Sequence, residues 1–177
     1  DPAVEQFTVI YQISDMPVLF GEQEIAANAF SVDSTFFKIF PYRVIAGSGR
    51  IVRSRDVVIT RSFWKKKLGG KNAIGATFKN TKGNKFTIIG VVDDPDTKTS
   101  WMPDIFMSDE LDEFLFFDPI YAMLMAPDTD IALLNKKYSK EHPRSKWSTY
   151  ETVRYQYLPL KDLYYDKDHA TKAMSGY

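Results

Sequence analysis

The chain contains no cysteine among its 177 residues. This absence excludes disulfide bonds, cysteine-ligated zinc, iron–sulfur clusters and thiol catalysis, but it does not indicate a cellular compartment. Histidine is almost as rare, with only His142 and His169, and neither belongs to an HxxxH or HxxE spacing. A histidine metal site and a catalytic triad are therefore not expected, and the sequence indicates no cofactor.

Long apolar runs are also missing. None approaches the roughly 18 residues of a membrane-spanning helix, and the most apolar stretches are Phe114–Phe117 and Tyr121–Ala126. No signal peptide opens the chain at Asp1, and Phe7–Tyr11 already has the pattern of a strand. We therefore expect an excised piece of a larger protein, without the segments that target and anchor it.

The charged residues balance in number but not in position. The 23 Lys and Arg equal the 23 Asp and Glu, so the net charge indicates no particular partner. Thirteen bases and one acid lie in residues 38–90, whereas nine acids and one base lie in residues 93–118. Two interpretations stay open. In the first, the two blocks are solvated faces or attract each other within the fold. In the second, the basic block contacts an anionic partner such as a membrane surface or a protein.

The composition predicts a folded chain with a substantial core, because 44% of the residues are apolar and 15% are aromatic. The length fits one domain, or two small subdomains that share a boundary. Apolar and alternating segments bounded by turn residues predict strands at Phe7–Ile13, Glu22–Ala29, Asp56–Ile59, Ala76–Lys79, Lys85–Val92, Asp104–Met107, Ile120–Ala126 and Thr149–Leu158.

Helical spacing of apolar residues predicts short helices between these strands, at Ser31–Phe40, Arg61–Leu68 and Thr129–Tyr138. The expected N-caps are, in chain order, Asp33 or Ser34, Thr60, and Asp128 or Thr129. The buried side of the third helix is expected to be formed by Ile131, Leu133 and Leu134. The mixture indicates an α+β fold, in which Ile120–Leu158 has the size of a β-α-β unit.

Three weaker patterns are better explained by structure than by chemistry. Gly69-Gly70-Lys71 lacks the GxxxxGK[ST] frame of a phosphate loop, so we interpret it as the end of a helix. Asp93–Asp96 lacks the Gly and Glu of an EF-hand, so we interpret it as a solvated loop. The basic block near Phe63 and Trp64 matches no nucleic-acid-binding module, and no nucleic-acid partner is expected.

Several structural segments follow one another in an informative order and spacing, namely Val32–Phe40, Ile45–Gly47, Val57–Thr60, Leu68–Gly70, Ala73–Phe78 and Phe86–Asp94. Together they resemble the MacB-like periplasmic core domain, which lies between the first two transmembrane helices of FtsX-type permeases. Tyr157–Tyr164 is similar to the family's LxPLxDIY element before the second of these helices. The resemblance is good over residues 25–107, although Trp64–Lys67 departs from the usual helix residues.

The resemblance implies a porter-like subdomain with a β-α-β unit and a mostly β, sabre-like subdomain. It assigns residues 1–31 and 108–177 to the porter-like subdomain, and residues 32–107 to the sabre-like one. The family's opening strand and helix are short or missing before Asp1. The N-terminal part of the porter-like subdomain is therefore expected to be truncated.

The resemblance also implies a non-catalytic periplasmic domain of an inner-membrane ABC transporter permease. Such permeases are homodimers whose cytoplasmic ATPase moves the periplasmic domains, in efflux or in a lipoprotein or cell-envelope process. The implied partners are this ATPase, the second permease copy, and a periplasmic adaptor or envelope protein. Our hypothesis is that the basic block is the partner face of the sabre-like part, with candidate residues Lys65, Lys66 and Lys71.

Two other functions stay open for the sequence alone. A periplasmic ligand-binding or sensor module would show a buried pocket with converging polar groups. A hydrolase with an unrecognised carboxylate pair would show two carboxylates about 5–10 Å apart in a cleft.

Overall fold

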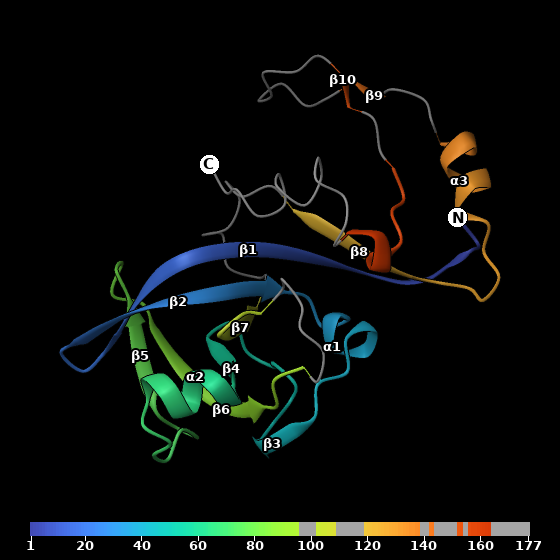
Figure 1. The fold of residues 1–177 in the computed structure, drawn as a ribbon. Helices are drawn as coiled ribbons and strands as arrows, with labels where there is room; N and C mark the ends of the chain where they lie inside the picture. The colour runs from blue at the N-terminus through green and yellow to red at the C-terminus, as the bar shows by residue number, and fades with distance from the viewer. Residues whose placement is uncertain (96–101, 109–118, 139–141, 144–151, 154–155, 164–177) are drawn as a thin grey trace. The chain divides into compact units, whose positions relative to one another are not determined.

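The computed structural model describes residues 1–95, 102–108, 119–138, 142–143, 152–153 and 156–163 (Figure 1). The chain divides into two compact units, of which the first ends at Leu124 and the second begins at Met125. Short helices are interspersed among the strands of a mixed parallel and antiparallel sheet. The predicted α+β class is confirmed.

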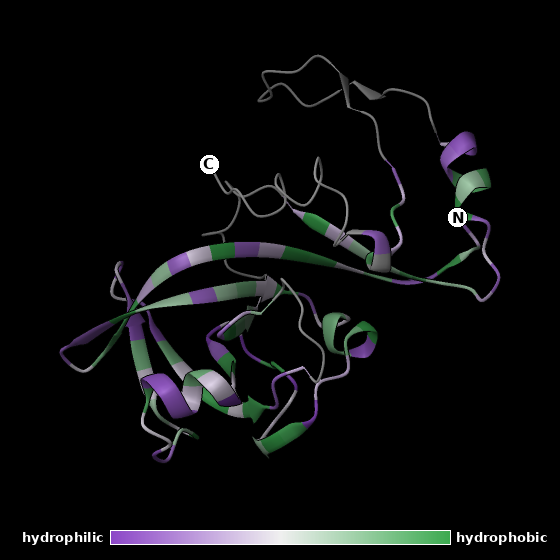
Figure 2. Ribbon diagram, viewed as in Figure 1, coloured by the Kyte–Doolittle hydropathy of each residue, from purple (hydrophilic) through white to green (hydrophobic). Residues whose placement is uncertain are grey.

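The first unit begins with a long antiparallel hairpin. β1 (Val4–Phe20) pairs with β2 (Gln23–Val32), and Gly21 has the left-handed φ of +63° that the turn between them needs. Apolar and polar residues alternate along both strands (Figure 2), so that one face of each is buried over much of its length. Both predicted strands are present, and β1 extends beyond its predicted strand at both ends.

Six strands of the sheet pair edge to edge in a closed ring. From β2 the ring continues to β7 (Ile105–Ser108), β4 (Asp56–Thr60) and β6 (Lys85–Val92). β6 then pairs with β5 (Thr77–Asn80), which returns to β1. The β2–β7 and β4–β6 pairs are parallel, and the other pairs of the ring are antiparallel.

Two further strands extend this ring. β3 (Val44–Gly47) pairs with β6, and β8 (Ile120–Met125) pairs with β1. Side chains alternate between two hydrophobic cores on the two faces of the sheet. In β4, Val57 and Ile59 lie in one core, and Val58 lies in the other.

Two short helices pack against these cores. α1 (Phe36–Ile39) buries Phe36 in the core that contains Val58, and the centroid of the Phe36 ring is 5.4 Å from that of Phe106. α2 (Arg61–Lys67) buries Phe63 in the other core, which contains Val57 and Ile59. α2 follows the sequence prediction, whereas α1 is much shorter than the predicted helix Ser31–Phe40, because Ser31 and Val32 belong to β2.

The predicted N-cap of α2 is confirmed, whereas the N-cap of α1 is Thr35, which was not predicted. The Thr60 hydroxyl accepts a hydrogen bond from the N–H of Phe63 at 3.4 Å at the start of α2. Of the two candidates before α1, Asp33 accepts a bond from the N–H of Phe36 at 3.1 Å, and Ser34 is exposed. The side chains of Thr60 and Asp33 each satisfy a backbone donor that the first helical turn leaves without a partner.

Gly90 lies where two backbone segments approach closely. A Cβ atom at Gly90 would lie 1.7 Å from the carbonyl oxygen of Ser48. The N–H of Ser48 in turn donates to the carbonyl of Ile89 at 2.8 Å. The missing side chain of Gly90 therefore allows this close approach, which sets the packing of the turn after β3 against β6.

The second unit contains short elements, namely α3 (Ile131–Lys137), β9 (His142–Pro143), β10 (Thr152–Val153) and α4 (Leu160–Leu163). Two predictions for α3 are wrong. Its N-cap is Asp130, which accepts a bond from the N–H of Leu133 at 3.0 Å, so the helix begins later than expected. Leu133, predicted to be buried, is 63% exposed, whereas Leu134 is buried as predicted.

The predicted β-α-β unit is not formed by the described part of Ile120–Leu158. β10 pairs antiparallel with β9 in a separate sheet of two strands, whereas β8 pairs with β1. The backbone of Tyr157 is held instead by the side chain of Asn135, through hydrogen bonds of 2.7 and 2.9 Å. Much of the predicted strand Thr149–Leu158 lies outside the described residues. The division into porter-like and sabre-like subdomains stays a prediction.

Candidate functional site

The loop after α2 is folded back onto the helix. The indole N–H of Trp64 donates to the carbonyl of Lys71 at 2.5 Å. The carbonyl of Trp64 accepts bonds from the N–H groups of Leu68 and Gly70, at 3.2 and 3.0 Å. Gly69 and Gly70 have φ values of +65° and +67°, which reverse the chain direction. The backbone of Lys71 is thereby fixed beside the helix.

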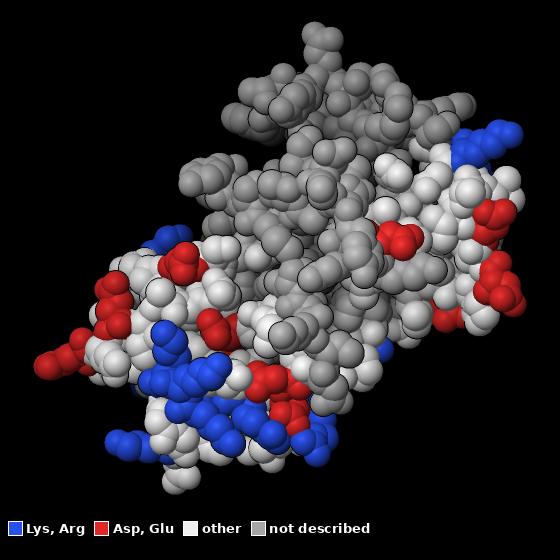
Figure 3. Space-filling view, viewed as in Figure 1, with Lys and Arg blue, Asp and Glu red and all other residues white. Residues whose placement is uncertain are grey.

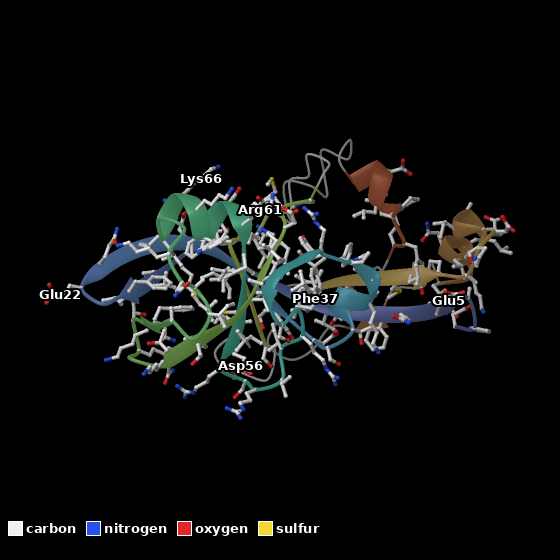
Figure 4. The ribbon with its side chains drawn as sticks, turned by 90° about the horizontal axis from the view of Figure 1, so that it is seen from below. Glu5, Glu22, Phe37, Asp56, Arg61 and Lys66 are labelled. Atoms are coloured by element: carbon white, nitrogen blue, oxygen red, sulfur yellow. The ribbon has the colours of Figure 1, made fainter. Side chains whose placement is uncertain are left out.

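Lysine side chains cover the solvent side of α2 and this loop. Lys65, Lys66 and Lys71 are exposed, and among the described residues none of them forms an ion pair. Lys66 lies on the outer face of the helix (Figure 4), and Lys and Arg side chains gather over α2 (Figure 3). The structure thus brings the three candidate residues together, and their role in partner binding stays a prediction.

Two arginines of the basic block pair within the fold instead. Asp93, just after β6, accepts hydrogen bonds from the guanidinium of Arg43 and forms an ion pair with Arg61 at 3.0 Å. The hydrogen bond from Arg43 is the largest cause that lowers the pKa of Asp93, and the charge of Arg61 adds to it. For these three residues, the two charge blocks attract each other within the fold.

Asp94 holds the first turn of α2. Its carboxylate accepts bonds from the N–H and the hydroxyl of Ser62, at 3.2 and 2.9 Å. Burial raises the pKa of the nearby Tyr42 hydroxyl, and the negative charge of Asp94 raises it further. The end of β6 therefore contacts both the start of α2 and the segment before β3, and it fixes the orientation of the helix that bears the lysines.

The described residues include no group of three or more His, Cys, Asp or Glu side chains that could hold a metal ion. His142 lies in β9, and His169 lies outside the described residues. In the part of the chain that the structure describes, no helix is long and apolar enough to span a membrane.

The sequence analysis missed a second pair of basic residues. Lys79 of β5 and Lys85 of β6 are direct partners in the strand register, and both are exposed. A signal was present, because the two lysines flank the turn of a predicted hairpin. Their opposition depends on the register of the two strands, which the turn sequence alone does not fix.

The sequence matches the family model of the MacB-like periplasmic core domain over residues 1–137. The fold is similar to the crystal structure of the periplasmic region of MacB from Actinobacillus actinomycetemcomitans, with a TM-score of 0.62 and 17% identity. This similarity covers 78% of our chain and 66% of that chain. No protein among the curated ones matches the sequence significantly.

Two further solved structures share the fold. One is a domain of a putative permease protein from Porphyromonas gingivalis, with a TM-score of 0.66 and 17% identity over 77% of our chain and 68% of that chain. The other is the extracellular domain of the noncanonic ABC-type transporter YknZ from Gram-positive bacteria, with a TM-score of 0.55 and 14% identity over 76% of each chain. The chain spans slightly less than two thirds of the MacB periplasmic region.

Proposed function

The chain belongs to the family of MacB-like periplasmic core domains and is therefore an extracytoplasmic domain, and we propose that it passes ATP-driven motion from an ABC transporter permease to partners outside the membrane. In this proposal the permease is a homodimer that works with a cytoplasmic ATPase. The domain itself is not an enzyme. Its movement acts on a periplasmic adaptor or envelope protein, in efflux or in a lipoprotein or cell-envelope process.

A closed ring of strands suits a domain that transmits motion. Each strand of the ring pairs with a neighbour on both edges, and its side chains enter two packed cores. Displacing one strand would break ladders on both sides, so the ring is expected to move as one body. β1 has 17 residues and spans about 50 Å. A displacement at its Val4 end would therefore reach the Gly21 turn.

The observation that carries the partner proposal is the lysine surface of α2. Lys65, Lys66 and Lys71 are exposed and make no ion pair with described residues, whereas Arg43 and Arg61 bind Asp93. A patch of one sign attracts oppositely charged partners and speeds their association. We propose that this surface binds an anionic region of the adaptor or envelope protein.

We propose a different role for each of the two predicted subdomains. The sabre-like part, residues 32–107, includes α2 and would make the partner contact. The porter-like part, residues 1–31 and 108–177, would connect this contact to the membrane helices. The two parts share strand ladders, because β1 pairs with β5 and β2 pairs with β7.

The proposal is tested in the full-length permease together with its ATPase. Lys65→Glu, Lys66→Glu and Lys71→Glu, combined, should abolish complementation of a strain that lacks the permease gene. A photo-crosslinker at the neighbouring exposed position 67 should also lose its product in this background. ATP hydrolysis should be retained, because the ATPase lies on the other side of the membrane.

The matched control changes the charge by the same amount at three other exposed bases, Lys38, Arg50 and Arg53. This control variant should complement normally. A triple variant of α2 that complements as well as wild type would rule out the partner surface.

A further inference from the structure

Lys79 and Lys85 form a like-charge pair that the fold itself does not neutralise. They are direct partners in the antiparallel ladder between β5 and β6. Like charges opposite each other destabilise a sheet. Within the described residues neither ammonium group forms an ion pair, and both side chains are exposed. Two adjacent cations are therefore presented to solvent at a cost in stability.

The pair borders a hollow with both apolar and polar walls. Leu19 of β1 is the ladder partner of Lys79 on its other side, so the three side chains lie on one face of neighbouring strands. The hollow has a volume of about 260 Å³ and is lined by Leu19, Gly21, Thr77, Phe78, Lys79 and Lys85. An occupant that fits this lining has an anionic group beside aliphatic atoms.

Hydrogen bonds to Asn80 hold the turn between β5 and β6. The buried side-chain oxygen of Asn80 accepts from the N–H groups of Lys82 and Asn84, at 3.1 and 2.9 Å. The N–H of Gly83 donates to the carbonyl of Asn80 at 2.9 Å. The backbone that presents the two lysines is therefore fixed before any ligand binds, which lowers the entropy cost of binding.

The lining of the hollow favours a protein segment as the source of the anion. Lys79 and Lys85 attract an anionic group such as a carboxylate. Leu19 beside them offers an apolar contact to the atoms next to that group. An acidic segment with interleaved apolar side chains supplies both.

We propose that Lys79 and Lys85 form a docking site for an acidic segment of a partner protein. A carboxylate of the segment binds between the two ammonium groups, and neighbouring aliphatic atoms contact Leu19. This site rests on the proposed function and adds to it the chemical nature of the partner, which is an acidic segment. It uses a different surface from the lysines of α2, so the two can be tested separately.

The test uses the 177-residue chain and a labelled peptide in which glutamate and leucine alternate over six residues. Combining Lys79→Glu with Lys85→Glu should weaken peptide binding at least about tenfold. The matched control, Lys38→Glu with Arg53→Glu at two exposed positions outside both lysine surfaces, changes the net charge equally and should change binding less than about threefold. Equal weakening by both variants would overturn the site, because the peptide would then sense only the net charge.

A single substitution separates binding from folding. Lys79→Glu replaces the repulsive pair by an attractive one across the ladder, so it should raise the thermal midpoint while it weakens peptide binding. A lowered midpoint would overturn the claim that the pair is maintained at a cost.

Tighter binding of phosphatidylglycerol vesicles than of the peptide would assign the site to a lipid surface and overturn the protein partner. Failure here would leave the α2 surface untouched.

Discussion

At the scale of single residues, Asp33 connects segments that are distant in the chain. Its Oδ1 accepts hydrogen bonds from the hydroxyl of Thr8 and from the N–H groups of Thr35 and Phe36, at 2.9, 2.7 and 3.1 Å. Its Oδ2 accepts from the N–H of Val9 at 2.9 Å. One carboxylate therefore joins β1 to the start of α1 and holds the ring of Phe36 in its core.

We expect Asp33→Ala to lower the free energy of unfolding by about 2–4 kcal/mol, because four donors lose a charged acceptor. Thr8 is fully buried, so its hydroxyl, which donates to Asp33, would lose this acceptor away from solvent. Ser34→Ala, at the exposed neighbouring position, should stay within about 0.5 kcal/mol of wild type. Urea unfolding followed by circular dichroism measures both. Equal stabilities of the two variants would contradict the role given to Asp33.

At the scale of elements, the orientation of α2 depends on two acids at the end of β6. Asp94 binds Ser62 in the first turn, and Asp93 binds Arg61 together with Arg43. Because Arg43 precedes β3, these contacts hold the helix, β6 and the segment before β3 in one arrangement. These contacts therefore determine the position of the lysine surface on α2.

This arrangement should make stability depend on pH through Asp93. The two arginines lower the pKa of this carboxylate in the fold below its ordinary value of 3.8. The pairing therefore stabilises the folded chain above about pH 4, and this contribution is lost as the pH falls through the folded-state pKa. Asp93→Asn should have a lower thermal midpoint than wild type at pH 7, with a gap that narrows below about pH 4. A gap independent of pH would show that the charge of Asp93 is not involved.

Most elements of the first unit could be predicted because their signals are local, whereas the short strand β3 was not predicted. Thr60 before an apolar helix face, Gly21 between two alternating segments and Gly69 after a helix each act within a few residues. α3 shows the limit of such signals. Asp128, Thr129 and Asp130 are all acceptable caps, and the local sequence does not choose among them.

At the scale of the whole molecule, the closed ring could not be predicted. An alternating strand has the same pattern whichever neighbour it pairs with, so nothing local indicates that β1 pairs with β5 or β2 with β7. The predicted β-α-β unit was wrong for the same reason. Lys79 and Lys85 lie opposite each other because of the strand register, and Asp93 meets its arginines because of the topology. Local sequence patterns indicate neither.

The central claim is that this ring moves as one body when the transporter uses ATP. Glu5 and Glu22 lie near opposite ends of β1 (Figure 4), and these 177 residues contain no cysteine. Any cysteine elsewhere in the full-length permease is replaced by serine before labelling. Spin labels at Glu5→Cys and Glu22→Cys, in one copy of the full-length permease, report the distance within the domain. A single label at Glu22→Cys in both copies reports the distance between domains.

We predict that the distance within the domain is the same in the nucleotide-free and ATP-bound transporter, while the distance between the two copies changes. A distance within the domain that shifts with ATP, or a distance between copies that stays constant, would contradict the account.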